Sequence, residues 1–269
     1  MFFKRDKNLS EESHVSMSII IAFLTALFGI PASLGVSLNE PECRTTEFTT
    51  LMYHHVRPYI ELDNAAQNIS VSPEEFQTQV QFLHDNKYHS ITSRDIYKGT
   101  VPCKSVMITF DDGYHDVMQN AYPIMKTYNY VWILGIILAK MDENDYLDGS
   151  DIRRLQTESW EIASHTWNHP NLSILPKELM PYQIDQSKKD LEKWFHTPIQ
   201  IFIYPNWRYT YATLDQIKTS GYSYAFTTQS GKTSLMDKPL ELKRVDVIPG
   251  MTEEAFAKLI EVPKTIAEK

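Results

Sequence analysis

Short runs of consecutive apolar residues recur along the chain, separated by stretches with a helical hydrophobic period. The run from Val106 to Phe110 is mostly β-branched or aromatic and does not alternate with polar residues. Such a run indicates a strand covered on both faces, as in a parallel sheet. Similar runs predict strands at residues 51–56, 131–139, 160–164, 201–204, 223–228 and 242–248.

The stretches between these runs predict helices. The first begins at Ser72-Pro73-Glu74-Glu75, with serine as N-cap, proline at the first helical position and glutamate closing a capping box. Phe76, Val80 and Leu83 supply its apolar stripe. Further helices are predicted at residues 117–128, 181–194, 213–220 and 252–260.

Strands that alternate with helices from residue 51 to residue 260 predict an α/β fold with a parallel sheet. About seven such units favour closure, so we expect a distorted (β/α)7 TIM-like barrel that forms a single domain over residues 41–269. A doubly wound open sheet is the alternative, but no Gly-x-Gly-x-x-Gly follows any predicted strand.

Residues 1–40 are expected to form a signal peptide or membrane anchor with its linker. Lys4, Arg5 and Lys7 precede an uncharged, largely apolar run over residues 15–39, the layout of a secretory signal or signal anchor. Small residues near the end of the run could equally frame a cleavage site. We therefore expect an exported protein, either secreted or held at the extracytoplasmic face of the cell membrane.

Charge and cysteine content narrow the possible partners. The 269 residues carry a formal net charge of −8, which argues against a nucleic-acid partner because such surfaces are normally basic. Cys43 and Cys103 are the two cysteines of the chain. A bridge between them is open in an oxidising compartment. Their separation along the chain and the place of Cys43 beside a predicted linker lead us to expect them unpaired.

Two adjacent carboxylates, Asp111 and Asp112, end the strand 106–110 and are followed by Gly113. In parallel α/β folds, chemistry is placed at the carboxyl ends of strands. Neighbouring side chains at such an end can take separate roles, one as a metal ligand and one in proton transfer. Capping of the following helix is the alternative interpretation.

His165 and His169 follow the predicted strand 160–164 and lie four residues apart. On a helical turn this spacing places both rings on one face, where they can bind one metal ion. A pair of this kind is weak evidence alone, but it is stronger beside a strand-end carboxylate. Two histidines and one aspartate suit zinc or a similar transition ion.

The two motifs together resemble a known family. Thr109–Tyr114 and Ser164–Pro170 are similar to the first two motifs of the polysaccharide deacetylases with a NodB-type domain, carbohydrate esterase family 4. Leu51-Met52-Tyr53-His54 resembles the N-terminal signature of a permuted branch that includes the poly-β-1,6-N-acetylglucosamine N-deacetylases. Phe202-Ile203-Tyr204-Pro205 resembles the third motif, which lines the substrate groove.

The resemblance implies removal of N-acetyl groups from an aminosugar polysaccharide, with a divalent metal as cofactor: zinc first, cobalt or nickel as alternatives. The metal ligands would be Asp112, His165 and His169. Asp111 would act as general base and His54 as the acid that protonates the departing amine. We expect a backbone N–H near Tyr114 to add an oxyanion donor. A strand-end histidine bonded to a carbonyl is the alternative for His54 and the favoured interpretation of His55.

The substrate groove is predicted to include Tyr114, Tyr204, Pro205 and Trp207. The last three could instead be core or surface residues, and Trp207 stands where relatives have glycine. Many relatives also carry arginine two residues before this proline, where the chain has Ile203, so the surroundings of the base must differ. Arg244 is a candidate partner that would keep Asp111 ionised, with a solvent-facing salt bridge as the alternative.

Several functions remain open within this resemblance. Poly-β-1,6-N-acetylglucosamine is the preferred substrate, with peptidoglycan, chitin-type polymers and O-acetylated xylan as alternatives. A carbohydrate-binding barrel without turnover is a second class, although the complete set of candidate residues argues against it. A glycosidase with Asp111 and a distant carboxylate is a third, and it would need no histidine pair.

Overall fold

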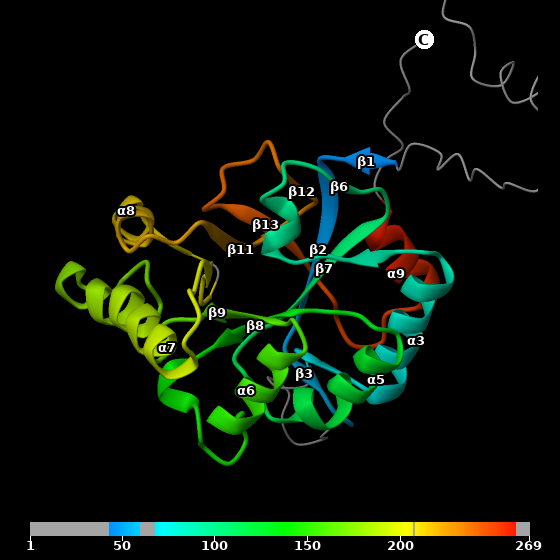
Figure 1. Ribbon diagram of the computed structural model, residues 1–269, viewed down its shortest axis with the longest axis horizontal. Helices are drawn as coiled ribbons and strands as arrows, with labels where there is room; N and C mark the ends of the chain where they lie inside the picture. Colours follow the sequence, from blue (N-terminus) through cyan, green and yellow to red (C-terminus); the bar gives the residue numbers. More distant parts are fainter. Residues whose placement is uncertain (1–42, 60–67, 207, 262–269) are drawn as a thin grey trace, which may run out of the picture. The chain divides into compact units, whose positions relative to one another are not determined.

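Seven parallel strands close into a barrel in the computed structural model (Figure 1). The strands are β2 (Glu47–Tyr53), β7 (Ser105–Phe110), β8 (Ile133–Ile136), β9 (Glu161–Ser164), β10 (Ile201–Ile203), β11 (Tyr224–Ser230) and β13 (Leu242–Asp246). Their order is β2-β13-β11-β10-β9-β8-β7, and β7 returns to β2 in parallel register from Thr49↔Val106 to Tyr53↔Phe110. The predicted (β/α)7 barrel is confirmed, and the open sheet is excluded.

The structure describes residues 43–59, 68–206 and 208–261. The predicted signal or anchor segment and the domain boundary after residue 40 lie outside these residues and stay predictions. In the described part of the chain, no helix has the length and apolar character needed to cross a membrane.

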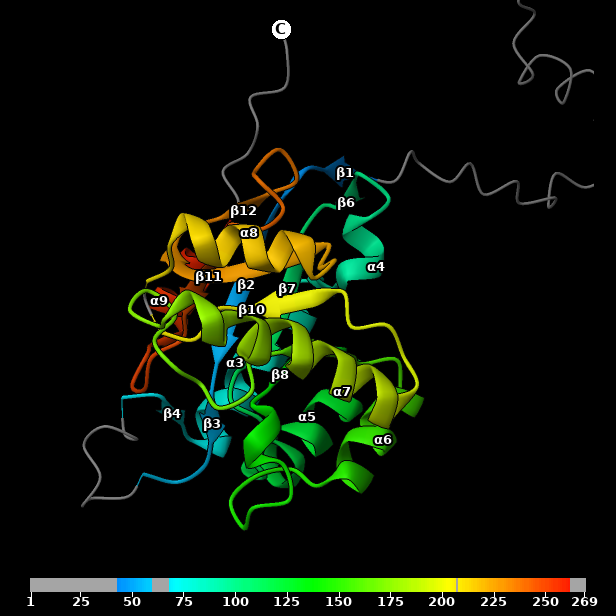
Figure 2. The same cartoon turned by 90° about the vertical axis from the view of Figure 1, so that its left-hand side faces the viewer.

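Helices surround the barrel (Figures 1 and 2). They are α3 (Pro73–Asp85), η1 (Val117–Ala121), α5 (Tyr122–Thr127), α6 (Gly149–Thr157), η4 (Tyr182–Gln186), α7 (Ser187–Phe195), α8 (Tyr211–Thr219) and α9 (Glu253–Ile260), with the short turns α4 (Ser93–Ile96), η2 (Leu138–Lys140) and η3 (Lys177–Leu179). The capping box of α3 is present: Ser72 accepts from the Glu75 N–H, and the Glu75 carboxylate accepts from the Ser72 N–H. Helix α6 was not predicted because it is mostly polar and buries only Ile152 and Leu155.

Short strands lie outside the barrel ring: β1 (Arg44–Thr45), β3 (His55–Val56), β4 (Ser70–Val71), β5 (His89–Ser90), β6 (Val101–Pro102) and β12 (Thr233–Ser234). The predicted strand 51–56 is divided at His54, because the chain leaves the barrel there and His55 pairs with Ser70 of β4. The predicted strand 131–139 is too long. Beyond Ile136 the amides of Leu138 and Ala139 donate to Thr166 O and Trp167 O instead of a strand partner.

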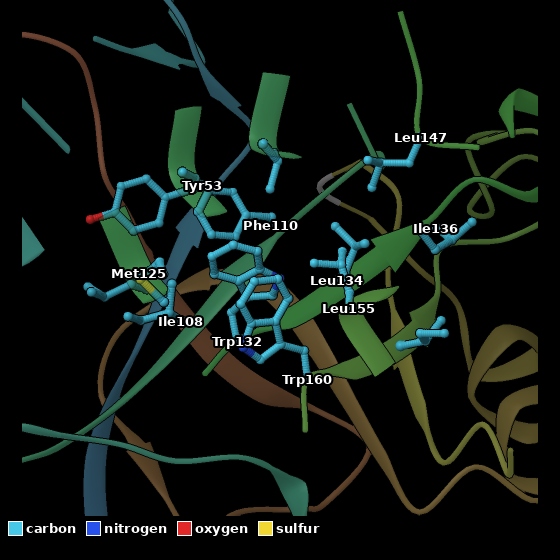
Figure 3. Packing of buried hydrophobic residues seen from close by; sticks show 14 of the residues in the cluster. Tyr53, Ile108, Phe110, Met125, Trp132, Leu134, Ile136, Leu147, Leu155 and Trp160 are labelled. Atoms are coloured by element: carbon cyan, nitrogen blue, oxygen red, sulfur yellow. The ribbon is translucent and has the colours of Figure 1, made fainter. Parts of the chain in front are cut away.

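The core has two parts because successive strand residues point to opposite faces. A smaller cluster, which includes Met107, Ile133 and Phe226, fills the barrel. The larger cluster lies between strands and helices. Figure 3 shows its aromatic centre, where the ring of Trp132 lies 5.1 Å from Phe110 and 3.8 Å from Trp160. This packing fixes the end of β7, where the aspartates begin.

Cys43 and Cys103 form a disulfide, so our expectation of unpaired cysteines is wrong. Strands β1 and β6 pair antiparallel, with Arg44 opposite Pro102, and the Cys103 N–H donates to Cys43 O. This ribbon brings the two Cα atoms to 5.3 Å despite a sequence separation of 60, well within reach of a bridge. Two-residue strands leave too little sequence pattern to predict such a pairing.

Candidate active site

The two aspartates follow β7 directly, and both are buried. Asp112 has φ +71° and Gly113 has φ +81°, so the backbone turns sharply in the left-handed region, which aspartate and glycine tolerate better than most residues. A Cβ at position 113 would also meet Ile136 Cδ1 at 3.2 Å. This turn sends the two carboxylates to different neighbours.

Asp111 is held by Arg244 from β13. The guanidinium donates from Nη1 to Oδ1 at 2.7 Å and from Nη2 to Oδ2 at 2.8 Å, while Nε donates to Thr227 O. Burial alone would raise the pKa of Asp111, but the charge and hydrogen bonds of Arg244 hold it below the ordinary value. The predicted pairing is confirmed, and it is buried rather than solvent-facing. The arginine expected two residues before Pro205 is Ile203 in this chain. Arg244 of β13 provides the cationic partner of Asp111 instead.

Asp112 lies among the two histidines that follow β9. Its Oδ1 is 3.3 Å from His165 Nε2 and 3.5 Å from His169 Nε2. The three residues form a group whose candidate ligand atoms all lie within 4.8 Å of one another. Burial would raise the pKa of Asp112, but His165, with His54 and His169 around it, holds it far below the ordinary value.

The donor set fits a divalent cation. His165 Nδ1 lies 2.8 Å from Ile203 O and can bond it only as the N–H donor, which leaves Nε2 as a lone pair in the neutral ring. Asp112 Oδ1 is buried and has no hydrogen bond. Burial opposes a charge on His165, but Asp112 and Asp111 raise the pKa of that ring above its ordinary value, so a cation bound there would replace a proton. Two nitrogens and one carboxylate oxygen with nothing bridging them are the ligands that zinc, cobalt or nickel prefer.

The loop between the two histidines is tightly supported. Thr166 and His169 have φ of +69° and +62°, and Thr166 Oγ1 accepts from the His169 N–H. Burial, followed by the charge of His165, lowers the pKa of His169 to about 4. At neutral pH His169 is therefore uncharged, the state in which imidazole binds a metal.

His54 occupies the break between β2 and β3, close enough to Asp111, Asp112 and Arg244 for their charges to act on it. Burial lowers its pKa, and the two aspartates oppose this effect. Asp246, at the end of β13, also interacts with His54: burial raises the pKa of Asp246, and His54 is the first of the groups that lower it. Sequence reasoning missed Asp246, because the predicted strand 242–248 placed it inside a strand, whereas β13 ends at this residue.

His55 and Tyr114 lie against each other beside this site, with ring centroids 3.6 Å apart. We expected His55 to bond a carbonyl, but its Nδ1 bonds the carboxylate of Asp116 at 2.6 Å. Tyr114 and Tyr146 face each other in an antiparallel bridge. The bridge is made by the hydrogen bonds from His115 N to Asp145 O and from Leu147 N to Gly113 O, and the backbone N–H of Tyr114 takes part in neither. Among the described residues no hydrogen-bond partner of that N–H is found, so it keeps the donor capacity that an oxyanion would need.

The predicted groove residues of the third motif are placed differently from one another. Tyr204 is 1% exposed and donates its hydroxyl to Leu240 O. This placement corrects the groove assignment of its side chain in favour of the core alternative, because the aromatic ring packs on Tyr209 at 4.5 Å. Pro205 is buried as well, and Trp207 lies outside the described residues.

Fold and site together define a deacetylase barrel, and the comparisons with known proteins agree. The family model described as "Polysaccharide deacetylase" matches residues 98–225. The Bacillus subtilis (strain 168) protein YxkH, which carries the name of this family, is 32% identical over 219 residues, or 80% of this chain and 76% of that protein. The chain belongs to the polysaccharide deacetylase family, a family of hydrolases.

Two further relatives are informative. The poly-β-1,6-N-acetyl-D-glucosamine N-deacetylase of Staphylococcus aureus (strain MRSA252) is 28% identical over 237 residues, or 78% of this chain and 80% of that protein. The Streptococcus pyogenes deacetylase PplD, solved in complex with acetate, superposes with a TM-score of 0.76 at 26% identity and covers 80% of this chain and 99% of that one.

Proposed function

We propose that the protein is a metal-dependent N-deacetylase of an aminosugar polymer. The observation that carries this proposal is the division of the two aspartates: Asp111 is fully paired with Arg244, whereas Asp112 faces His165 and His169 with an unpaired oxygen. The polymer named for the Staphylococcus relative makes poly-β-1,6-N-acetylglucosamine the first substrate to test.

Asp112, His165 and His169 would hold the cation. A divalent ion bound there lowers the pKa of a water ligand and polarises an acyl oxygen, which favours amide hydrolysis at neutral pH. Zinc is the first ion to test, with cobalt and nickel next, because all three accept this donor set.

Asp111 would take the proton from the attacking water. Arg244 keeps the carboxylate ionised and fixes its direction through two hydrogen bonds, so the acceptor state is present before substrate binds. Positioning of this kind removes part of the entropic barrier of the reaction.

His54 would protonate the departing amine, and the Tyr114 N–H would donate to the acetyl oxygen as negative charge develops on it. Burial lowers the pKa of His54, and the charges of Asp111 and Asp112 oppose this lowering; Asp246 adds a third carboxylate nearby. An amine leaves poorly without a proton, so this acid matters more for amides than for activated esters.

The acetate bound to PplD is the acid released by deacetylation and supports this reaction class. The Cys43–Cys103 disulfide supports export, because structural disulfides persist outside the reducing cytosol. We propose that the protein acts at the cell envelope, either secreted or anchored through residues 1–40.

Acetate release tests the proposed function. The full-length protein would be stripped with a chelator and assayed on oligomers of poly-β-1,6-N-acetylglucosamine, on chitin oligomers, on peptidoglycan and on acetylated xylan, each with and without zinc, cobalt or nickel. We expect acetate only with metal and the highest kcat/KM on the β-1,6 oligomers. No acetate from any substrate with any metal would end the proposal, and a preference for xylan would change the substrate class.

A further inference from the structure

A second histidine–carboxylate pair connects the loop after the aspartates to β3, the short strand directly after His54. His55 Nδ1 lies 2.6 Å from Asp116 Oδ2, and Asp116 Oδ1 accepts from the Val56 N–H at 3.1 Å. Asn120 adds a further tie by donating from Nδ2 to Val56 O at 2.7 Å. The side chains of His55 and Asp116 are 5% and 12% exposed, so water competes little for these bonds.

The placement of Asp116 shows that this pair does not serve helix capping. Asp116 is the residue before η1, yet its side chain makes no capping hydrogen bond to that helix. Both carboxylate oxygens are instead used by His55 and Val56. The nearest aspartate to the start of η1 is thus committed to the neighbouring strand.

The ring of His55 fixes Tyr114 from one face. The two rings are stacked at 3.6 Å with an angle of 21° between their planes, and Tyr146 covers Tyr114 at 5.1 Å. Tyr114 therefore contacts two rings, one of which is bonded to a carboxylate. Its backbone cannot shift without disturbing the stacked pair.

We propose that His55, oriented by Asp116, is a positioning residue for the Tyr114 backbone N–H. This inference rests on the proposed function, in which that N–H donates to the acetyl oxygen. An oxyanion donor acts only when it lies about 2.7–3.1 Å from the oxygen at which charge develops. A tyrosine released from its stack lets the donor move, and a displacement of about 1 Å can cost on the order of 100-fold in rate.

The test uses His55→Phe, which keeps an aromatic ring but removes the bond to Asp116, and Asp116→Asn, which keeps an acceptor for the Val56 N–H but replaces the charged acceptor of His55 by an amide donor. Each metal-loaded variant would be assayed on an N-acetylglucosamine oligomer and on 4-nitrophenyl acetate, whose leaving group needs no acid. We expect kcat to fall about 10- to 100-fold on both substrates, with KM within about 2-fold and metal content unchanged. Because both changes act on the same bond, the double variant should be no slower than the slower single variant.

His84→Phe is the matched control, because His84 lies 3.1 Å from Asp85 in an exposed pair away from the site and should keep the wild-type kcat. A loss confined to the amide substrate would mean that His55 acts through His54, and this would overturn the proposal. Wild-type kcat in both single variants, or a loss that merely follows lower metal content or earlier unfolding, would overturn it as well. If the wild-type protein turns over neither substrate, the proposed function itself fails before any variant is compared.

Discussion

The two aspartates at the end of β7 share residue type and burial but differ in their hydrogen-bond partners. Asp111 and Asp112 are 2% and 8% exposed, but both oxygens of Asp111 are bonded to one guanidinium, while Oδ1 of Asp112 has no hydrogen bond and faces two imidazoles. The Asp111 half of the site, which consists of Asp111 and Arg244, has its hydrogen-bond partners within the protein. Under the proposed function, a cation held by Asp112, His165 and His169 would complete the Asp112 half.

The proposed roles of Asp111 and Asp112 therefore follow from the surroundings of each carboxylate rather than from residue type. A turn in the left-handed region at Asp112 and Gly113 separates two carboxylates that leave the same strand. Strand β13 then supplies an arginine to one of them, and the loop after β9 supplies histidines to the other. The contacts of one aspartate can therefore be disrupted while those of the other stay in place.

The largest expected effect is on the Asp111 half. Arg244→Met leaves Asp111 buried without its partner, so the free energy of unfolding should fall by about 3–5 kcal/mol and turnover should collapse. Metal content should stay at the wild-type level, because the hydrogen bonds of Arg244 reach Asp111, Thr109 and Thr227 and none of the three candidate ligands. Urea unfolding and metal analysis of the folded protein measure both. Arg94→Met is the control: its partner Glu161 is 3.4 Å away and Arg94 is 67% exposed, so the change should stay below about 1 kcal/mol.

Removal of the disulfide should destabilise the protein without changing either half of the site. A bridge across 60 residues stabilises a domain by about 2–4 kcal/mol, and replacing both Cys43 and Cys103 by serine should lower the unfolding free energy by that amount. The kcat and metal content of the folded protein should not change. A variant that also loses metal would show that the two halves are not independent of global stability.

The last predicted effect depends on pH and concerns the Asp112 half without metal. His169 has a pKa of about 4 when folded against 6.5 for the free side chain. Between these values the unfolded chain binds a proton that the folded chain does not, so this contribution to stability is complete above pH 6.5 and is lost as the pH falls towards 4. The thermal midpoint of chelator-treated wild type should therefore fall relative to that of chelator-treated His169→Gln as the pH is lowered through this range. Parallel curves would contradict this assignment.

Much of this arrangement could be predicted from the sequence. The apolar runs predicted all seven barrel strands, and the spacing of His165 and His169 together with the strand-end aspartates predicted the group that the structure brings together. These signals are local in sequence, so they do not depend on how distant segments pack. The capping box at Ser72 was predictable for the same reason.

Other features depend on contacts between distant segments. The disulfide requires the β1–β6 ribbon, and the bond between His55 and Asp116 joins residues 61 positions apart. Tyr204 was assigned to the groove from its motif, but its side chain turns inward because the chain beyond β10 packs it on Tyr209. Arg244 was a candidate from the sequence, whereas its burial and its two bonds to Asp111 were visible only in the fold.

The central claim is the division of roles between Asp111 and Asp112, and zinc binding by two isosteric variants tests it most directly. Isothermal titration calorimetry with zinc on chelator-treated Asp111→Asn and Asp112→Asn compares the two halves in one type of measurement. The account predicts that Asp111→Asn binds zinc one-to-one but has no turnover, and that Asp112→Asn does not bind it at micromolar concentrations. Stoichiometric zinc on Asp112→Asn, or loss of zinc from a folded Asp111→Asn, would contradict it.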